Sequence, residues 1–227
     1  MTTASGSGRA RASGQARAGA GGVDRAFAAN VLGTLAQTIA DRTSAGAQAA
    51  ARHGAHAPAA LVSLLWYPDR PVTFLAARLR ISHPGAVQLS TRLADDGLVR
   101  RFPGADGRTV LLSLTAGGER AARAVLVERS AVLDRAMDGL DDATVAIVTE
   151  GVCAMLAALT DDLLTSEFMC RMCDELACPD DRCPVERAEP SPPHRRGTGY
   201  GVRARRPGQA TSTRKTATTR TTGGPPG

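Results

Sequence analysis

The feature of the sequence that most constrains the fold is a change of hydrophobic period at Gly97. From Pro58 up to this glycine, apolar residues recur at the three-to-four-residue spacing of helices. Beyond it the period becomes strand-like in residues 98–102 and 109–114, and the loop 103–108 between them contains two glycines. This is the pattern of a β-hairpin. The sequence therefore predicts three short helices followed by a hairpin.

Local signals predict where these helices begin and end. The first is closed by the turn residues of 68–71, and the second begins at Thr73, a good N-cap. The third begins at Ser82 with Pro84 in its first turn, and it ends at Gly97. We expect the buried faces of the second and third helices to consist of Phe74, Leu75, Leu79, Ala86, Leu89 and Leu93.

Longer helical patterns flank this block. An N-terminal helix with an apolar stripe loosens at Gly46 and Gly54, and Thr115 and Asp141 can cap two further helices, the first of which runs to about residue 137. The stripe of the N-terminal helix is Phe27, Val31, Leu32, Leu35 and Ile39, and the inward residues expected after Asp141 are Val145, Val148, Val152, Met155, Leu156, Leu159 and Leu163. Cys153, in this apolar stretch, is interpreted as a small buried hydrophobe.

The formal net charge of +6 is unevenly distributed. Residues 1–22 hold three Arg and no acid, and residues 186–227 hold nine basic and two acidic side chains. We interpret both ends as disordered. Residues 57–114 hold seven Arg and four Asp, so this block is the basic part of an otherwise acidic middle. No run reaches the about 18 apolar residues of a membrane span, and the N-terminus lacks the apolar core of a secretory signal.

Three helices followed by a hairpin is the order of a winged helix-turn-helix, whose third helix enters the major groove of DNA. In residues 71–117 the sequence resembles the MarR family of bacterial transcriptional regulators. The motifs are a Ser-x-Pro recognition helix, L-x-x-DGLV-R-R, a wing with Asp and Arg, and LSLT-x-G, within PVTFLAARLRISHPGAVQLSTRLADDGLVRRFPGADGRTVLLSLTAG. In layout the resemblance covers roughly residues 24–165. It implies that the outer helices form an obligate homodimer and that the wing reaches the minor groove.

The expected fold is mainly α with a small β-hairpin wing, a winged helix-turn-helix flanked by N- and C-terminal dimerisation helices. Six parts follow one another along the chain. They are a disordered N-terminal arm (1–22), an N-terminal dimerisation helix region (23–56), the winged helix-turn-helix DNA-binding domain (57–114), C-terminal dimerisation helices (115–165), a cysteine-rich metal-binding segment (166–185) and a disordered basic tail (186–227).

Polar side chains on and around the third helix are the candidates for DNA contact. Gln can pair with adenine, Arg with guanine or phosphate, and Ser, Thr and His can donate or accept. A solvated helix face is the usual alternative, but placement inside a helix-turn-helix favours DNA. At the wing tip, Arg108 suits a narrow minor groove, and Asp106 steadies the loop or the Arg side chain. The predicted DNA-binding residues are Arg80, Ser82, His83, Gln88, Thr91, Arg92, Arg100 and Arg108.

Beyond the helices predicted for dimerisation, Cys170, Cys173, Cys178 and Cys183 form a C-x2-C-x4-C-x4-C cluster. In a chain without a secretory signal, such spacing favours a metal over disulfides. The spacing is that of a zinc knuckle with Cys178 in the histidine position, although the glycines and aromatic residues of a knuckle are absent. We expect structural zinc, with an iron–sulfur cluster or a thiol switch as alternatives. MarR-family members typically lack such a segment.

The sequence thus predicts a cytoplasmic, homodimeric transcriptional regulator that represses from a pseudo-palindromic operator in double-stranded DNA. The resemblance implies release by a small-molecule effector or by cysteine oxidation, and the cysteine segment adds redox or metal sensing. The alternative is a zinc-stabilised architectural or interaction protein that binds DNA without sequence preference. An enzyme is not expected, because no redox fold or cofactor loop accompanies the cysteines and Gly197-x-Gly199-x-Gly201 has no strand before it.

Overall fold

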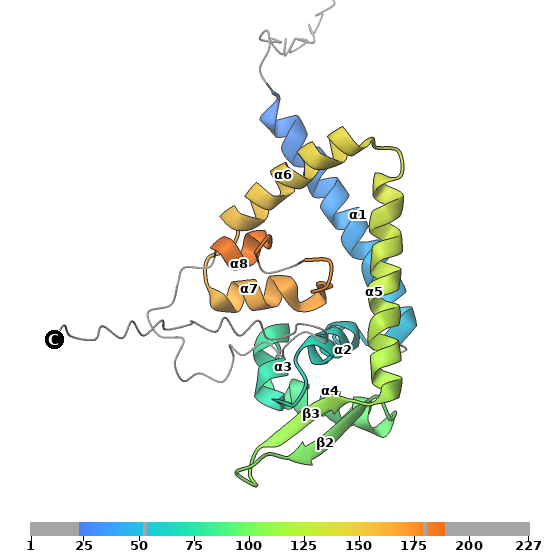
Figure 1. The fold of residues 1–227 in the computed structure, drawn as a ribbon, viewed down its shortest axis with the longest axis vertical. Coiled ribbons are helices and arrows are strands. Elements are labelled where there is room, and N and C mark those ends of the chain that lie inside the picture. Colours follow the sequence, from blue (N-terminus) through green and yellow to red (C-terminus); the bar gives the residue numbers. More distant parts are fainter. Residues whose placement is uncertain (1–22, 52–53, 179–180, 189–227) are drawn as a thin grey trace, which may run out of the picture. The chain divides into compact units, whose positions relative to one another are not determined.

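The structure, a computed structural model, describes residues 23–51, 54–178 and 181–188. The predicted N-terminal arm and all but the first residues of the predicted tail lie outside these ranges. The chain divides into two compact units, residues 1–41 and 42–227, and the boundary falls inside the first helix. The described elements (Figure 1) are α1 (Arg25–Ala51), α2 (Ala57–Trp66), β1 (Arg70–Pro71), α3 (Val72–Leu79), α4 (His83–Asp95), β2 (Val99–Pro103), β3 (Val110–Leu114), α5 (Ala116–Met137), α6 (Asp142–Ala158), α7 (Leu163–Met169), the 3-10 helix η1 (Cys170–Met172) and α8 (Pro184–Ala188).

Several of the predicted helix boundaries are confirmed by their caps. The Ser82 hydroxyl accepts a hydrogen bond from the amide of Gly85 at the start of α4, and the residues Thr115 and Asp141 cap α5 and α6 in the same way. The predicted start of α3 at Thr73 is wrong. This helix already begins at Val72, and its N-cap is Pro71, which has an extended conformation with φ of −69° and ψ of 158°.

The predicted hairpin is confirmed, and a third strand joins it. The sheet has the order β1-β3-β2, with antiparallel pairing of Val99 to Leu114 and of Arg70 to Leu112. β1 has only two residues, one of which is Pro71, and it was therefore predicted as part of a turn. Proline is tolerated there since β1 is an edge strand.

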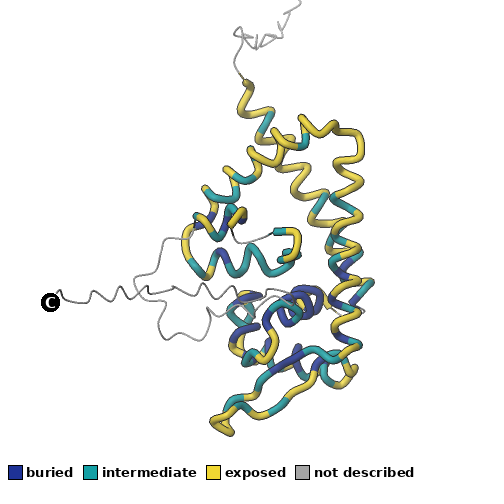
Figure 2. Tube along the Cα trace, viewed as in Figure 1, coloured by how far each residue is buried: buried dark blue, intermediate teal, exposed yellow. Residues whose placement is uncertain are grey.

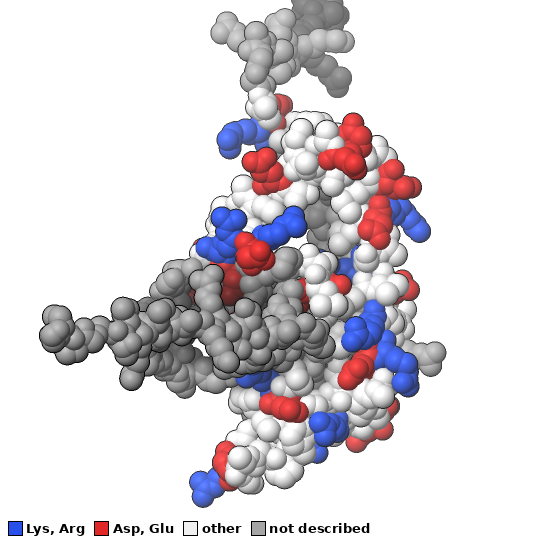
Figure 3. Space-filling view, in the orientation of Figure 1, with Lys and Arg blue, Asp and Glu red and all other residues white. Residues whose placement is uncertain are grey.

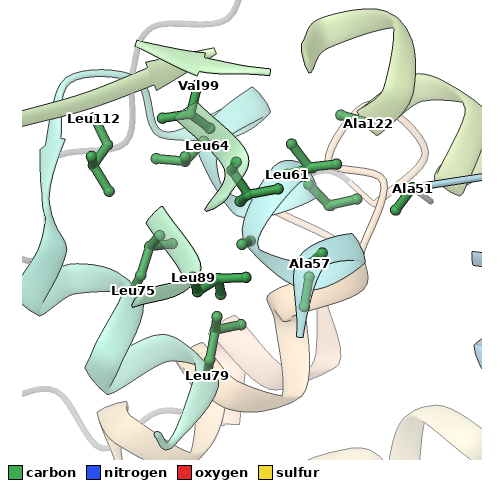
Figure 4. Packing of buried hydrophobic residues seen from close by; sticks show 14 of the residues in the cluster. Ala51, Ala57, Leu61, Leu64, Leu75, Leu79, Leu89, Val99, Leu112 and Ala122 are labelled. Atoms are coloured by element: carbon green, nitrogen blue, oxygen red, sulfur yellow. The ribbon is translucent and has the colours of Figure 1, made fainter. Parts of the chain in front are cut away.

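The hydrophobic core of the second unit lies where α2, α3, α4, the sheet and the first half of α5 meet. All six predicted core residues of α3 and α4 are buried. Figure 2 shows the buried positions concentrated in these elements, and Figure 4 shows Leu61, Leu64, Leu75, Leu89, Val99 and Leu112 packed together. This core holds the buried face of α4 and leaves the opposite face of the helix exposed.

Two predicted inward faces are not buried within the chain. The exposed residues are Phe27, Val31, Leu32 and Leu35 on α1, and Val148, Val152, Met155 and Leu159 on or just after α6. Cys153 is half-buried rather than buried. Leu163 does not belong to α6, because Asp162 caps the new helix α7 by accepting a hydrogen bond from the Thr165 amide. Among the described residues, no helix is long and apolar enough to cross a membrane.

Candidate nucleic-acid interface and cysteine cluster

Helix α4 presents one apolar and one polar face. Ala86, Leu89 and Leu93 point into the core, and the helix stops where Gly97 adopts a left-handed conformation with φ of 69°. The predicted contact residues Ser82, His83, Gln88 and Arg92 are exposed, as expected for a helix that meets DNA.

The loop at the tip of the wing is held by Asp106 and carries an exposed Arg. Asp106 accepts hydrogen bonds from the amides of Arg108 and Thr109 at 3.0 and 2.9 Å, and from the Thr109 hydroxyl at 2.6 Å. These bonds, the one from the Thr109 hydroxyl most of all, hold the pKa of Asp106 below its usual 3.8. Asp106 therefore steadies the loop backbone, one of its two predicted roles, and leaves the Arg108 side chain exposed.

A cleft of about 330 Å³ lies between α4 and the wing hairpin. It is lined by Pro71, Val72, Thr73, His83, Val87, Arg101, Arg108, Thr109 and Val110. Basic side chains project from the hairpin region in Figure 3, whereas acidic ones gather toward the turn between α5 and α6. The structure thus places His83, at the start of α4, and Arg108, in the wing loop, along the same cleft.

Arg101 is a strand residue whose charge suits a phosphate contact, but it is not one of the eight predicted DNA-binding residues. Its Nη1 donates to the Thr91 hydroxyl at 2.8 Å, which places its guanidinium beside α4. Arg100, which was included, points to the other side of the strand, where its Nη2 lies 3.9 Å from the Asp69 carboxylate. The alternation of side chains along a strand could have identified Arg101, because residue 101 lies on the same face of β2 as the buried Val99.

The C-terminal segment packs on the helix-turn-helix through two arginines of α3 and its C-cap. Arg78 is 2 % exposed; its guanidinium pairs with Glu167 and donates to the carbonyl of Cys170 at 3.3 Å. Arg80, predicted to contact DNA, donates to the Thr165 hydroxyl at 3.1 Å and stacks 4.6 Å from the Phe168 ring centre. The structure therefore places Arg80 against α7.

The four predicted metal ligands meet next to this contact. Cys170 is hydrogen-bonded to Cys173 and Cys183, and Cys183 also to Cys178. Hydrogen bonds with Cys173 and then Cys183 raise the pKa of Cys170 far above 9.0, whereas the bond with Cys170 lowers the pKa of Cys173 to about 7 and of Cys183 to about 5. In the described ranges no three His, Cys, Asp or Glu side chains are arranged to hold a metal ion.

The fold and these sites define a winged helix-turn-helix protein. No family model and no curated protein matches the sequence. Among solved structures, RV1404 from Mycobacterium tuberculosis is similar over 62 % of this chain and 97 % of its own, with 18 % identity and a TM-score of 0.55. A MarR family protein from Bacillus stearothermophilus matches over 60 % and 95 %, with 20 % identity and a TM-score of 0.54.

YusO from Bacillus subtilis is similar over 59 % of this chain and 94 % of its own, with 22 % identity and a TM-score of 0.52. The chain therefore has the MarR-type winged-helix fold, which confirms the fold expected from residues 71–117. Because these proteins are covered almost completely and this chain only to about 60 %, part of this chain lies outside the shared fold.

Proposed function

We propose that this protein is a DNA-binding transcription regulator without enzymatic activity, and that α4 and the wing form its DNA-contacting surface. The observation that carries the proposal is the exposed polar face of α4, with His83, Gln88 and Arg92, beside a cleft shared with Arg101 and Arg108. Hydrogen-bonding side chains on a helix held by its apolar face suit the major groove. An exposed guanidinium on a hairpin suits the minor groove. The MarR-type fold supports this placement.

We infer that the protein acts as a homodimer. The exposed apolar faces of α1 and α6 are each typical of a surface that a second copy covers. A two-fold dimer presents two α4 helices, so its operator is a pseudo-palindrome with half-sites about 10 base pairs apart. A dimer bound across a promoter excludes the polymerase, and we therefore propose that it represses.

A second cavity supports control by a small molecule. It has a volume of about 250 Å³ and is lined by Gly54, Ala55, His56, Ile81, Gly85, Gln88, Leu89, Arg92 and Leu93. This volume is somewhat below the roughly 300 Å³ at which pockets for drug-sized ligands begin, so a small effector fits better. Because Gln88 and Arg92 line the cavity, an occupant would change the groups that α4 offers to DNA.

The decisive experiment selects genomic fragments with the full chain and compares its affinity for a selected fragment and for random DNA at 150 mM salt. A regulator prefers its own site by at least about 10³-fold. The Gln88→Ala and Arg92→Ala variants should each lose roughly 5- to 150-fold of that preference, which corresponds to about 1–3 kcal/mol. Arg135→Ala, at an exposed site in the last turn of α5, is the matched control and should change nothing.

Equal affinity for selected and random DNA would contradict the proposal and support the architectural protein that the sequence left as the alternative. The dimer is tested separately by sedimentation. A Met155→Glu variant places a charge in the exposed apolar face of α6, and we expect monomers that no longer bind the pseudo-palindrome.

A further inference from the structure

The cysteine cluster is more compact than its sequence spacing requires. Cys170, at the start of η1, interacts with Cys173 nearby and with Cys183, which lies 13 positions further along the chain, just before α8. Cys183 also interacts with Cys178. These three interactions involve all four cysteines of the cluster. Cys183 is only 5 % exposed, so the cluster is closed off from solvent on that side.

Backbone amides bond to one sulfur atom and to one backbone carbonyl of the cluster. The amide of Glu186 donates to Sγ of Cys183 at 3.5 Å, and the Cys173 amide donates to the carbonyl of Cys170 at 3.0 Å, which tightens the C-x2-C turn. Amide donors of this kind stabilise a thiolate and orient it in a metal site. Positive charge is also close, since Arg129 and Arg78 act electrostatically on the Cys173 thiol.

The cluster is attached to the DNA-binding domain by polar contacts to backbone atoms of the cysteines themselves. The indole Nε1 of Trp66, at the end of α2, donates to the carbonyl of Cys173 at 3.0 Å. Arg78 of α3 donates to the carbonyl of Cys170. Met172, between the two cysteines, packs against the hydrophobic core. The position of η1 on α2 and α3 is thereby linked to the conformation of the cysteine loop.

We propose that Cys170, Cys173, Cys178 and Cys183 bind one thiophilic divalent cation of the zinc class, and that the bound ion fastens the segment 163–188 onto α2 and α3. Four thiolates from one short segment are a complete ligand set for tetrahedral zinc, with bonds of about 2.3 Å to sulfur. An iron–sulfur cluster held by the same four thiolates is the outcome that the test must distinguish from a single ion.

The thiols of the described structure are not arranged as a closed ligand set. Metal entry exchanges the thiol–thiol hydrogen bonds for four metal–sulfur bonds, and each thiol that is still protonated releases its proton to solvent. No electron is transferred and no oxidant is required. The resulting site carries a charge of −2, which the neighbouring Arg78 and Arg129 offset in part.

The test uses the full chain, purified under reducing conditions, and Trp66 as a built-in reporter, since it is the only Trp in the sequence. We expect one equivalent of zinc by elemental analysis. Co²⁺ added after removal of zinc should give the visible bands of a tetrahedral thiolate site. A chelator should shift the Trp66 emission to the red, because the indole loses its bond to Cys173 when the segment loosens, and zinc should reverse the shift.

The Cys173→Ser and Cys178→Ser variants should lose the Co²⁺ bands and the response of Trp66 to the chelator. Cys153→Ser, which removes a half-buried thiol on α6 outside the cluster, is the matched control and should keep both. Iron with sulfide, a disulfide in the reduced preparation, or zinc well below one equivalent that Co²⁺ cannot replace would overturn the proposal. Since none of these readouts involves DNA, their result is independent of the proposed function.

Discussion

Replacing Glu167 with Gln tests how strongly the C-terminal segment stabilises the DNA-binding domain. Glu167 is the carboxylate partner of Arg78, whose side chain is 2 % exposed, while its own side chain is 20 % exposed. Removing one partner of a buried ion pair costs about 3–5 kcal/mol, because the other charge stays buried without compensation. Arg78 keeps the Ser63 hydroxyl and the Cys170 carbonyl as acceptors, so the lower end of this range applies.

We therefore expect the free energy of unfolding to fall by about 3 kcal/mol, and the melting temperature by about 9 °C for a chain of this size. Thermal and denaturant unfolding followed by circular dichroism measure both quantities. Glu150→Gln, the same chemical change at an exposed site on α6, should alter the unfolding free energy by less than about 0.5 kcal/mol. If the two variants were equally stable, Arg78 would not depend on α7, and the segment would not be part of the domain.

Three further outcomes follow from the structure. Gly118→Ala should destabilise strongly, because an added Cβ would overlap the backbone carbonyl that precedes β2, whereas Gly117→Ala, which meets only ordinary contacts, should not; denaturant unfolding compares them. In Asp162 the helix-capping hydrogen bonds hold the pKa below 3.8, so its charge stabilises the fold above that pH and ceases to do so as pH falls through the lowered pKa. The stability difference between wild type and Asp162→Asn should therefore vanish in acid. Arg108→Ala should reduce the slope of log affinity against log salt by about one, and an unchanged slope would remove Arg108 from the interface.

Short-range signals allowed the DNA-binding domain to be predicted from the sequence. The Ser82 cap, the left-handed Gly97 and the period of Leu89 and Leu93 act within one or two helical turns, so the sequence determined the boundaries and the buried face of α4. The same holds for the wing, where Asp106 bonds to residues two and three positions along.

Periodicity predicted that the apolar stripes of α1 and α6 would be buried, but these stripes are exposed within the chain. A hydrophobic period identifies a face that needs a partner and contains no information on whether that partner is another part of the chain. The face predicted around Met155 is therefore the one on which the proposed dimer depends.

By itself the sequence determined the helix-turn-helix, its caps, its wing and the grouping of four cysteines, because these depend on neighbours at most 15 positions away, the separation of Val99 and Leu114 in the wing. Only the tertiary structure decided that Arg78 is buried against Glu167, that Arg80 lies on α7 and that Trp66 bonds to Cys173. These partners are between 85 and 107 positions apart. No local period or spacing records such a contact, since it arises from the packing of two elements whose own sequences are compatible with many neighbours.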